Sequence, residues 1–212
     1  MLVTDSANIQ SLITAVETAD SAPALIGAVR SLAAAQSPEA VTTLITVLGF
    51  NNPGAAVAAV DGLVALGQAA VPALLEQLDG YNYGARAWAI RALSIIGDPR
   101  ALDVLIETAR GDFALSVRRA AAKGLGFVDW KALPDERRDS AQTLAIDTLL
   151  AALDDPEWVV RYAAIVGLSG LLSVLPAADA AVENIKARLS TCSQADDEVV
   201  VRARAQMALK PQ

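Results

Sequence analysis

The 212-residue chain is 54% hydrophobic, carries 17 Lys+Arg against 24 Asp+Glu for a formal net charge of −7, and contains no histidine. A Ser-His-Asp triad, a Cys-His dyad and a histidine-ligated metal are therefore excluded within this chain. The single cysteine, Cys192, likewise excludes an internal disulfide and a multi-cysteine metal site. Because an acidic chain is a poor match to a phosphate backbone, a DNA-handling helical-repeat enzyme is the least favoured function.

The sequence gives no sign of membrane insertion or secretion. No stretch reaches the roughly 18 uninterrupted apolar residues that a membrane span requires. The first residues, MLVTDSANIQ, lack the basic and apolar regions of a secretory signal. With no disulfide chemistry either, we expect a cytoplasmic protein without a membrane span.

Apolar sets with the i, i+3, i+4, i+7 spacing of an amphipathic helix recur along the chain. In chain order they are Ile9-Leu12-Ile13-Val16, Val41-Leu44-Ile45-Leu48, Val71-Leu74-Leu75-Leu78, Leu102-Leu105-Ile106-Ala109, Ile146-Leu149-Leu150-Leu153 and the weaker Val182-Ile185-Leu189. The sets begin 32, 30, 31, 44 and 36 residues apart. A recurrence of this length is typical of repeats built from helix pairs.

A second family of helices, rich in small residues, is expected between these sets. Its members are Ala55-Ala58-Ala59-Gly62-Leu63, Ala85-Trp88-Ala89-Ala92-Leu93, Val117-Ala120-Ala121-Gly124-Leu125 and Val160-Ala163-Ala164-Gly167-Leu168, with looser versions at Ala24–Leu32 and Val201–Leu209. Small residues on one face let a neighbouring helix approach closely. The sequence therefore predicts an all-α fold, an α-solenoid (α-α superhelix) of about six helix pairs that forms a single domain over residues 1–212.

Proline and glycine mark several expected helix boundaries. Ser37-Pro38, Asp98-Pro99 and Asp155-Pro156 each place a capping residue before a proline, as is typical of a helix start. Gly67 and Gly97 follow expected helices, where a left-handed residue is favoured.

The fifth repeat is preceded by an insertion at about 127–142. An insertion in a solenoid usually forms a loop or a helix extension on one face, often a binding face. Trp130 lies in it and is unusual for a solvated loop, so it either packs locally as a plug or contacts another chain. We take Trp130 and Trp158 as the candidates for partner contact.

An arginine recurs at one equivalent position of four second helices: Arg86, Arg118, Arg161 and Arg202. An aspartate precedes the first three by six or seven residues: Asp79, Asp112 and Asp155. One interpretation is an Asp–Arg ladder that ties successive repeats together. The other is that these arginines line the concave surface and bind carboxylates of a ligand, with Arg91 or Arg119 free to do so as well. The ladder is favoured of the two.

Aromatic residues gather at the start of the third second helix. Tyr81, Tyr83 and Trp88 lie within eight positions, although the chain contains only three each of Phe, Trp and Tyr. Together with Arg86 they suit a flat, conjugated ligand that carries carboxylates. The alternative is that Trp88 fills the layer between helices and the tyrosines close a turn.

No residue pattern indicates acid-base or nucleophilic catalysis. Cys192 has no base nearby, and its acidic neighbours Asp196 and Asp197 disfavour a thiolate. The paired carboxylates Asp154-Asp155 and Asp196-Asp197 are better explained as helix caps than as an acid-base pair.

The run from Tyr81 to Gly126, YNYGARAWAIRALSIIGDPRALDVLIETARGDFALSVRRAAAKGLG, resembles the central region of the phycobilin lyases of the E/F type. The most specific parts are YNYGARAW and DFALSVRRAAAKGLG. The likeness is greatest to the F-type subunits of phycocyanin alpha-subunit phycocyanobilin lyases. It extends as a repeat pattern over essentially the full chain and implies that the repeats are HEAT-like.

The resemblance implies a cyanobacterial enzyme in which an F-type and an E-type subunit form a heterodimer. Such an enzyme attaches phycocyanobilin, an open-chain tetrapyrrole, to a cysteine of the phycocyanin alpha subunit. The acceptor thiol adds across the ethylidene group of the bilin A ring and forms a thioether, so the nucleophile belongs to the acceptor protein. Phycocyanobilin is then a substrate, and neither a tightly bound cofactor nor a metal is implied.

On this interpretation the chain positions the bilin rather than reacting with it. The candidate bilin-binding residues are Tyr81, Tyr83, Arg86, Trp88, Arg91, Arg118 and Arg119, whose arginines would hold the two propionates. Asp112 is the candidate catalytic residue, as a hydrogen-bond partner of the pyrrole nitrogens.

Two further functions are compared with ligation. One relative of the family both attaches and isomerises the bilin, through a motif with adjacent His and Cys. Because this chain has no histidine, attachment without isomerisation is favoured. The main alternative is a non-catalytic HEAT-repeat adaptor that binds phycobiliproteins during assembly or degradation of the phycobilisome.

Overall fold

The computed structural model describes residues 2–79, 83–176 and 179–210, without the side chains of residues 2–6, 79 and 83. Over these ranges the chain forms helices and no strand. The α-helices are α1 (Leu2–Glu17), α2 (Ala22–Ala34), α3 (Val41–Leu48), α4 (Pro53–Leu66), α5 (Val71–Glu76), α6 (Tyr83–Ile96), α7 (Leu102–Gly111), α8 (Leu115–Leu125), α9 (Asp135–Ala152), α10 (Trp158–Leu172), α11 (Ala180–Ala195) and α12 (Val199–Ala208). Short 3-10 helices are η1 (Pro38–Ala40), η2 (Gly67–Ala69), η3 (Gln77–Asp79), η4 (Pro99–Ala101) and η5 (Trp130–Ala132).

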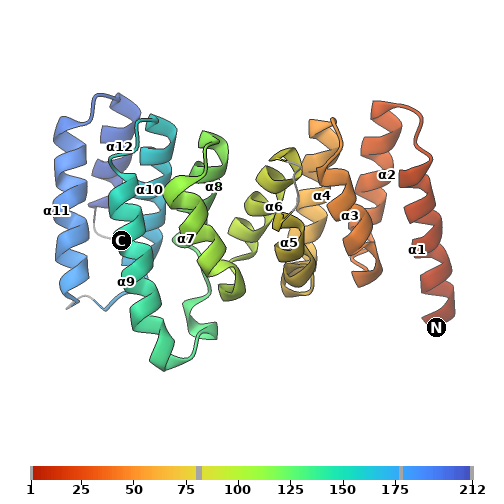
Figure 1. Ribbon diagram of the computed structural model, residues 1–212, viewed down its shortest axis with the longest axis horizontal. Helices are drawn as coiled ribbons and strands as arrows, with labels where there is room; N and C mark the ends of the chain where they lie inside the picture. The colour runs from red at the N-terminus through yellow and green to blue at the C-terminus, as the bar shows by residue number, and fades with distance from the viewer. Residues whose placement is uncertain (1, 80–82, 177–178, 211–212) are drawn as a thin grey trace. The chain divides into compact units, whose positions relative to one another are not determined.

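The helices divide into two compact units, Met1–Ile96 and Gly97–Gln212, which are described separately (Figure 1). In unit 2, α7 packs on α8, α9 on α10 and α11 on α12, and the second helices α8, α10 and α12 also pack side by side. Unit 1 repeats this arrangement with α2, α4 and α6 as its second helices. The all-α solenoid of about six helix pairs is therefore confirmed, whereas the single-domain organisation stays a prediction.

The two helix families contribute different side chains to the core. First helices supply large apolar residues that are fully buried: Leu44, Leu74, Leu105, Leu149 and Ile185. Second helices supply fully buried alanines at one repeated position: Ala59, Ala89, Ala121, Ala164 and Ala205. This division is the one that the two apolar patterns predict.

Glycines bring α8 and α10 into close contact. A Cβ atom on Gly126 would meet the backbone of Gly167, and one on Gly167 would meet the carbonyl oxygen of Ala122 and the side chain of Leu149. The absence of these Cβ atoms lets the two backbones approach closely.

Two of the three predicted caps, Ser37 and Asp98, are present, and each begins a 3-10 helix. The third was wrong: α10 begins at Trp158 after Glu157, and Asp155 instead accepts the Glu157 backbone N–H in the preceding turn. Ser37 and Asp98 accept hydrogen bonds from the backbone N–H groups two residues on, and so cap the 3-10 helices η1 and η4. A 3-10 turn commonly opens an α-helix, and α3 and α7 follow these two directly. The positive φ of Gly67 (59°) and Gly97 (69°) is as predicted.

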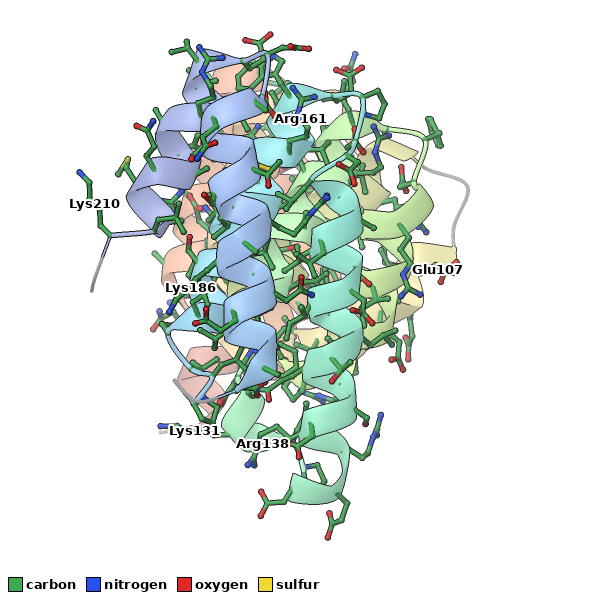
Figure 2. All side chains as sticks on the ribbon, turned by 90° about the vertical axis from the view of Figure 1, so that its left-hand side faces the viewer. Glu107, Lys131, Arg138, Arg161, Lys186 and Lys210 are labelled. Atoms are coloured by element: carbon green, nitrogen blue, oxygen red, sulfur yellow. The ribbon has the colours of Figure 1, made fainter. Side chains whose placement is uncertain are left out.

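The insertion forms η5 and the first turns of α9. Arg138 fixes this segment, since its Nε donates to the carbonyl oxygen of Trp130 and its Nη2 to that of Leu133, both at 2.8 Å. Figures 1 and 2 show the first turns of α9 projecting past the neighbouring helices of unit 2, and Figure 2 labels Arg138 at that end. The segment is thus a helix extension, one of the two forms expected. No helix within the described ranges is long and apolar enough to span a membrane.

Candidate functional site

Arg118 in α8 links two successive repeats of unit 2. Its Nε donates to Asp155 Oδ2 (2.8 Å) and its Nη2 to Asp155 Oδ1 (3.0 Å), a bidentate pair with the turn before α10. Its Nη1 donates to the carbonyl oxygen of Asp112 at 2.9 Å, in the turn before its own helix. The guanidinium therefore joins one repeat to the next through all three nitrogens.

Arg161 in α10 makes the same contacts one repeat later. Its Nε donates to Asp196 Oδ2 (2.8 Å), its Nη2 to Asp196 Oδ1 (2.9 Å), and its Nη1 to the carbonyl oxygen of Asp155 (3.0 Å). We call Arg118, Asp155, Arg161, Asp196 and Arg202 the arginine ladder. The favoured interpretation of the recurring arginines, a ladder between repeats, is thereby confirmed in unit 2.

Burial and hydrogen bonding shape the electrostatics of the ladder. The Asp196 carboxylate has a lowered pKa because Arg161 donates to it, against an opposing effect of burial. Burial raises the pKa of Asp155, but the hydrogen bonds from Arg118 and from the Glu157 backbone N–H outweigh it, so the net pKa is also lowered. The carboxylates therefore stay charged, and the paired arginines have raised pKa values.

In the arginine ladder, Arg118 has a structural role. Its side chain is only 13% exposed, and its three nitrogens already have acceptors. Arg119, the next residue, is exposed and has no ion-pair or hydrogen-bond partner for its guanidinium in the described part of the chain. Of these two predicted bilin ligands, Arg119 is the one that can bind an external carboxylate.

Exposed apolar and basic residues share one side of α8, α10 and α12. Leu115, Arg119 and Lys123 follow each other by single turns on α8, as Trp158 and Tyr162 do on α10, and Val199 and Met207 lie two turns apart on α12. We call these seven residues the open face. Trp158 and Tyr162 are 41% and 38% exposed, which is high for aromatic side chains in a helix of a packed layer. The open face thus offers aromatic surface and a guanidinium group on adjacent helices.

In unit 1, the structure describes the side chains of only some residues of the predicted aromatic cluster. Tyr81 lies outside the described residues, and the side chain of Tyr83, the first residue of α6, is likewise not described. The half-buried Trp88 has the Arg91 guanidinium carbon 5.5 Å from its ring centroid, a cation–π contact, and Arg91 itself is exposed. Arg86 Nη1 donates to the carbonyl oxygen of Leu78 at 3.3 Å.

The predicted catalytic residue and the cysteine are both partly buried. Asp112 Oδ1 accepts a hydrogen bond from the Ala114 backbone N–H at 2.9 Å, so it closes the turn before α8. Burial raises the pKa of the Cys192 thiol, which therefore stays protonated near neutral pH. No group of three or more His, Cys, Asp or Glu side chains in the described ranges could hold a metal ion.

Trp130 and Trp158, the two candidates for partner contact, differ in their surroundings. Trp130 is 4% exposed, and Val128 and Leu133 on either side of it in the sequence are also buried. This placement favours the local plug over contact with another chain. Trp158 is exposed on the open face, where it is accessible to a ligand or partner.

Sequence reasoning missed Asp196 as a ladder residue and Tyr162 as part of the open face. Asp196 precedes Arg202 by six residues, the same spacing as Asp155 before Arg161, so the signal was present. Tyr162 occupies the position on α10 that Arg119 occupies on α8, counted from Val160 and Val117. Its exposure depends on which side of α10 the neighbouring helices cover, which the periodicity alone does not specify.

Comparison with known proteins identifies the class and then the family. Residues 57–126 match the family of HEAT repeats, and the helix pairs of both units define a helical-repeat protein of this class. The chain is 64% identical over 163 residues to the phycocyanin alpha phycocyanobilin lyase CpcF of Synechocystis sp. (strain PCC 6803), a match that covers 77% of this chain and 76% of that protein. It is 52% identical over 198 residues to the phycocyanobilin lyase subunit beta of Pseudanabaena tenuis, covering 92% and 70% of the two chains.

A solved structure agrees with these relatives. A chain of the complex of CpcE and CpcF of phycocyanin lyase from Nostoc sp. PCC7120 matches with a TM-score of 0.76 and 50% identity, over 82% of this chain and 100% of that chain. The present chain therefore belongs to the family of F-type, or beta, phycocyanobilin lyase subunits, as its resemblance implies.

Proposed function

We propose that the chain is the F-type subunit of a heterodimeric lyase that attaches phycocyanobilin, through a thioether, to a cysteine of the phycocyanin alpha subunit. The observation that carries this proposal is the 64% identity with a phycocyanin alpha phycocyanobilin lyase. The E-type partner is inferred from the related Nostoc complex, which contains CpcE as well as CpcF. Phycocyanobilin is the substrate, and a cytoplasmic enzyme without a tightly bound cofactor remains our prediction.

The chemistry of the chain supports a positioning role. The acceptor thiol adds across the ethylidene double bond of ring A: its sulfur bonds to one carbon and its proton goes to the other. The chain contains no histidine, and its one thiol is held protonated by burial, so the nucleophile comes from the acceptor protein. What this chain supplies is a surface that binds the bilin in one conformation beside the acceptor cysteine.

We assign the bilin contact in unit 2 to the open face. Trp158 and Tyr162 present aromatic surface to a conjugated tetrapyrrole, and Arg119 on the adjacent helix presents a guanidinium group to a propionate. In unit 1, Trp88 and Arg91 offer the same pairing of ring and guanidinium. Tyr81, Tyr83 and Arg86 stay predictions for bilin contact, and Asp112 stays the predicted catalytic residue. Of Arg118 and Arg119, both predicted, we retain Arg119, because Arg118 is engaged by Asp155.

The test is reconstitution of the reaction. The chain is combined with an E-type partner, phycocyanobilin and apo-phycocyanin alpha subunit, and the alpha subunit is then examined under denaturing conditions for covalent bilin fluorescence. We expect fluorescence only when both lyase subunits are present. If both subunits are soluble and no covalent product forms, the proposal is wrong.

The adaptor alternative predicts a different result. An adaptor would bind apo- or holo-phycobiliprotein but leave the absorption spectrum of free phycocyanobilin unchanged. A lyase subunit holds the bilin in one conformation, so its complex with the E-type partner is expected to shift that spectrum.

A further inference from the structure

Arg202 in α12 repeats only half of the contacts made by the other ladder arginines. Its Nη1 donates to the carbonyl oxygens of Asp196 and Asp197, as Arg161 Nη1 does to those of Asp155 and Pro156. The Nε–Nη2 edge of Arg161 binds a carboxylate 35 residues further on. The same edge of Arg202 has no partner within the described ranges 2–79, 83–176 and 179–210.

The two filled positions of the ladder define the ligand that this edge accepts. In both, an aspartate approaches with one oxygen on Nε and the other on Nη2, at 2.8–3.0 Å. Each aspartate also accepts the backbone N–H two residues on, Glu157 for Asp155 and Glu198 for Asp196, just before a second helix begins. The ligand is thus a carboxylate fixed in a turn at the start of a helix.

The Nη1 contacts hold Arg202 ready for such a ligand. Two backbone carbonyls already orient the guanidinium plane, so little side-chain freedom is left to lose when a carboxylate binds. A fork in a fixed orientation favours a bidentate carboxylate over a monodentate group.

We propose that the Nε–Nη2 edge of Arg202 binds a carboxylate of the E-type partner subunit, an aspartate or glutamate in a turn before a helix. The proposal rests on the proposed function, which supplies the partner. The heterodimer then continues the arginine ladder across the subunit interface, with the side of α12 that carries Arg202 as one contact surface.

The position of Arg202 argues for a protein carboxylate rather than a bilin propionate. The open face of α12 is marked by Val199 and Met207, and that of α10 by Trp158 and Tyr162. Arg161 points instead along the stack, because it binds the turn of the following repeat. Arg202, at the equivalent position of α12, makes the equivalent Nη1 contacts, so we expect its Nε–Nη2 edge to point along the stack as that of Arg161 does.

The experiment measures the dissociation constant of the complex with the E-type partner, in the absence of bilin, for the unmodified chain, R202Q, R202K and K186Q. Lys186 on α11, labelled in Figure 2, is exposed and pairs with the exposed Glu183, so K186Q is a control for the loss of one positive charge. We expect R202Q to weaken the complex about tenfold or more and K186Q to change it less than about threefold. R202K keeps the charge and a donor for the carbonyls but lacks the fork, so it should weaken binding nearly as much as R202Q.

A double-mutant cycle identifies the partner residue. Acidic residues of the E-type subunit that precede helices are changed to Asn or Gln one at a time, and one such variant is expected to weaken the complex no further when combined with R202Q. Thermal unfolding of R202Q and R202K is measured as well, to verify that both variants are folded.

The outcomes separate this inference from the proposed function. If the unmodified chain binds the E-type subunit and folded R202Q and R202K bind equally well, the inference is wrong and the proposed function stands. A loss of affinity that arises only when phycocyanobilin is present also overturns it, since Arg202 would then bind a propionate. If the unmodified chain binds no E-type subunit, both fail.

Discussion

Arg118 and Arg119 are adjacent in α8 and have opposite surroundings. The first is enclosed by Asp155 and the carbonyl oxygen of Asp112, whereas the second is exposed on the open face. One arginine therefore stabilises the stack of repeats and the other is available to substrate. We therefore expect a change at Arg118 to alter stability and a change at Arg119 to alter activity.

Arg119→Ala is expected to lower bilin transfer about tenfold or more and to leave the unfolding temperature nearly unchanged. The reason is loss of a charge-assisted hydrogen bond to a propionate, from a side chain that makes no contact needed for folding. Transfer is measured as covalent fluorescence of the alpha subunit, with the exposed Arg137→Ala on α9 as the control. Equal transfer rates for R119A and R137A would show that Arg119 does not contact the bilin.

Arg118→Ala is expected to lower the free energy of unfolding by about 2–4 kcal/mol, because it leaves the Asp155 carboxylate partly buried without its partner. Urea unfolding at neutral pH measures this change. R119A is the matched control and should shift the unfolding free energy by less than about 0.5 kcal/mol. If R118A and R119A were equally stable, the ladder would contribute nothing to folding.

At the scale of elements, α8 and α10 depend on glycine where their backbones approach. Gly167→Ala is expected to destabilise the protein by about 1–3 kcal/mol, because its Cβ would overlap the Ala122 carbonyl oxygen and Leu149. Gly27→Ala in α2 is the control, since nothing lies within 4 Å of a Cβ there. Helix propensity predicts that G27A gains up to about 1 kcal/mol. Chemical denaturation of both variants is the measurement, and a loss of stability in G27A comparable with that in G167A would contradict this account.

The elements themselves followed from the sequence because two periodic signals agree. The large residues of the first helices and the small residues of the second specify the pairing, and Leu105 and Ala121 are buried as that pattern requires. The starts of α3 and α7 were less predictable, because a cap before proline is compatible with both a 3-10 and an α-helical first turn. The extent of α9 was also open, since its added turns are fixed by Arg138, a contact between side chain and backbone that no periodicity contains.

The candidate site was only partly predictable for a related reason. Recurrence placed Arg118 and Arg161 correctly as equivalent residues, but their carboxylate partners lie 37 and 35 residues further on, in the next repeat. Local spacing instead points to the aspartate six residues before each arginine. In the structure only the backbone carbonyl of that aspartate contacts the arginine, by accepting a hydrogen bond from its Nη1. The stacking of repeats, rather than local spacing, therefore decides which arginine pairs with a carboxylate of the protein and which one stays exposed.

At the scale of the whole molecule, Asp98, Asp155 and Asp196 have lowered pKa values and lie in unit 2. Each is ion-paired with an arginine in the folded state. A carboxylate whose folded pKa lies below its unfolded value, near 3.8, binds a proton more readily in the unfolded chain. These groups therefore stabilise the fold fully above that value, and their contribution is lost as the pH falls through the lowered folded pKa values.

The double variant D155N/D196N should accordingly differ most from the unmodified protein near neutral pH and least in strong acid. Asparagine carries no charge, so in the variant the ladder arginines have no carboxylate to bind at any pH. The unmodified protein loses the same stabilisation only in acid, where Asp155 and Asp196 become protonated. Unfolding free energies measured from about pH 7 to about pH 2.5 should show a difference that is constant above about pH 5 and shrinks below about pH 4. Asp147→Asn, an exposed position on α9, serves as the control and should give no comparable difference. A gap between D155N/D196N and the unmodified protein that is the same at every pH would mean that packing, rather than the charge of the two carboxylates, links the repeats of unit 2.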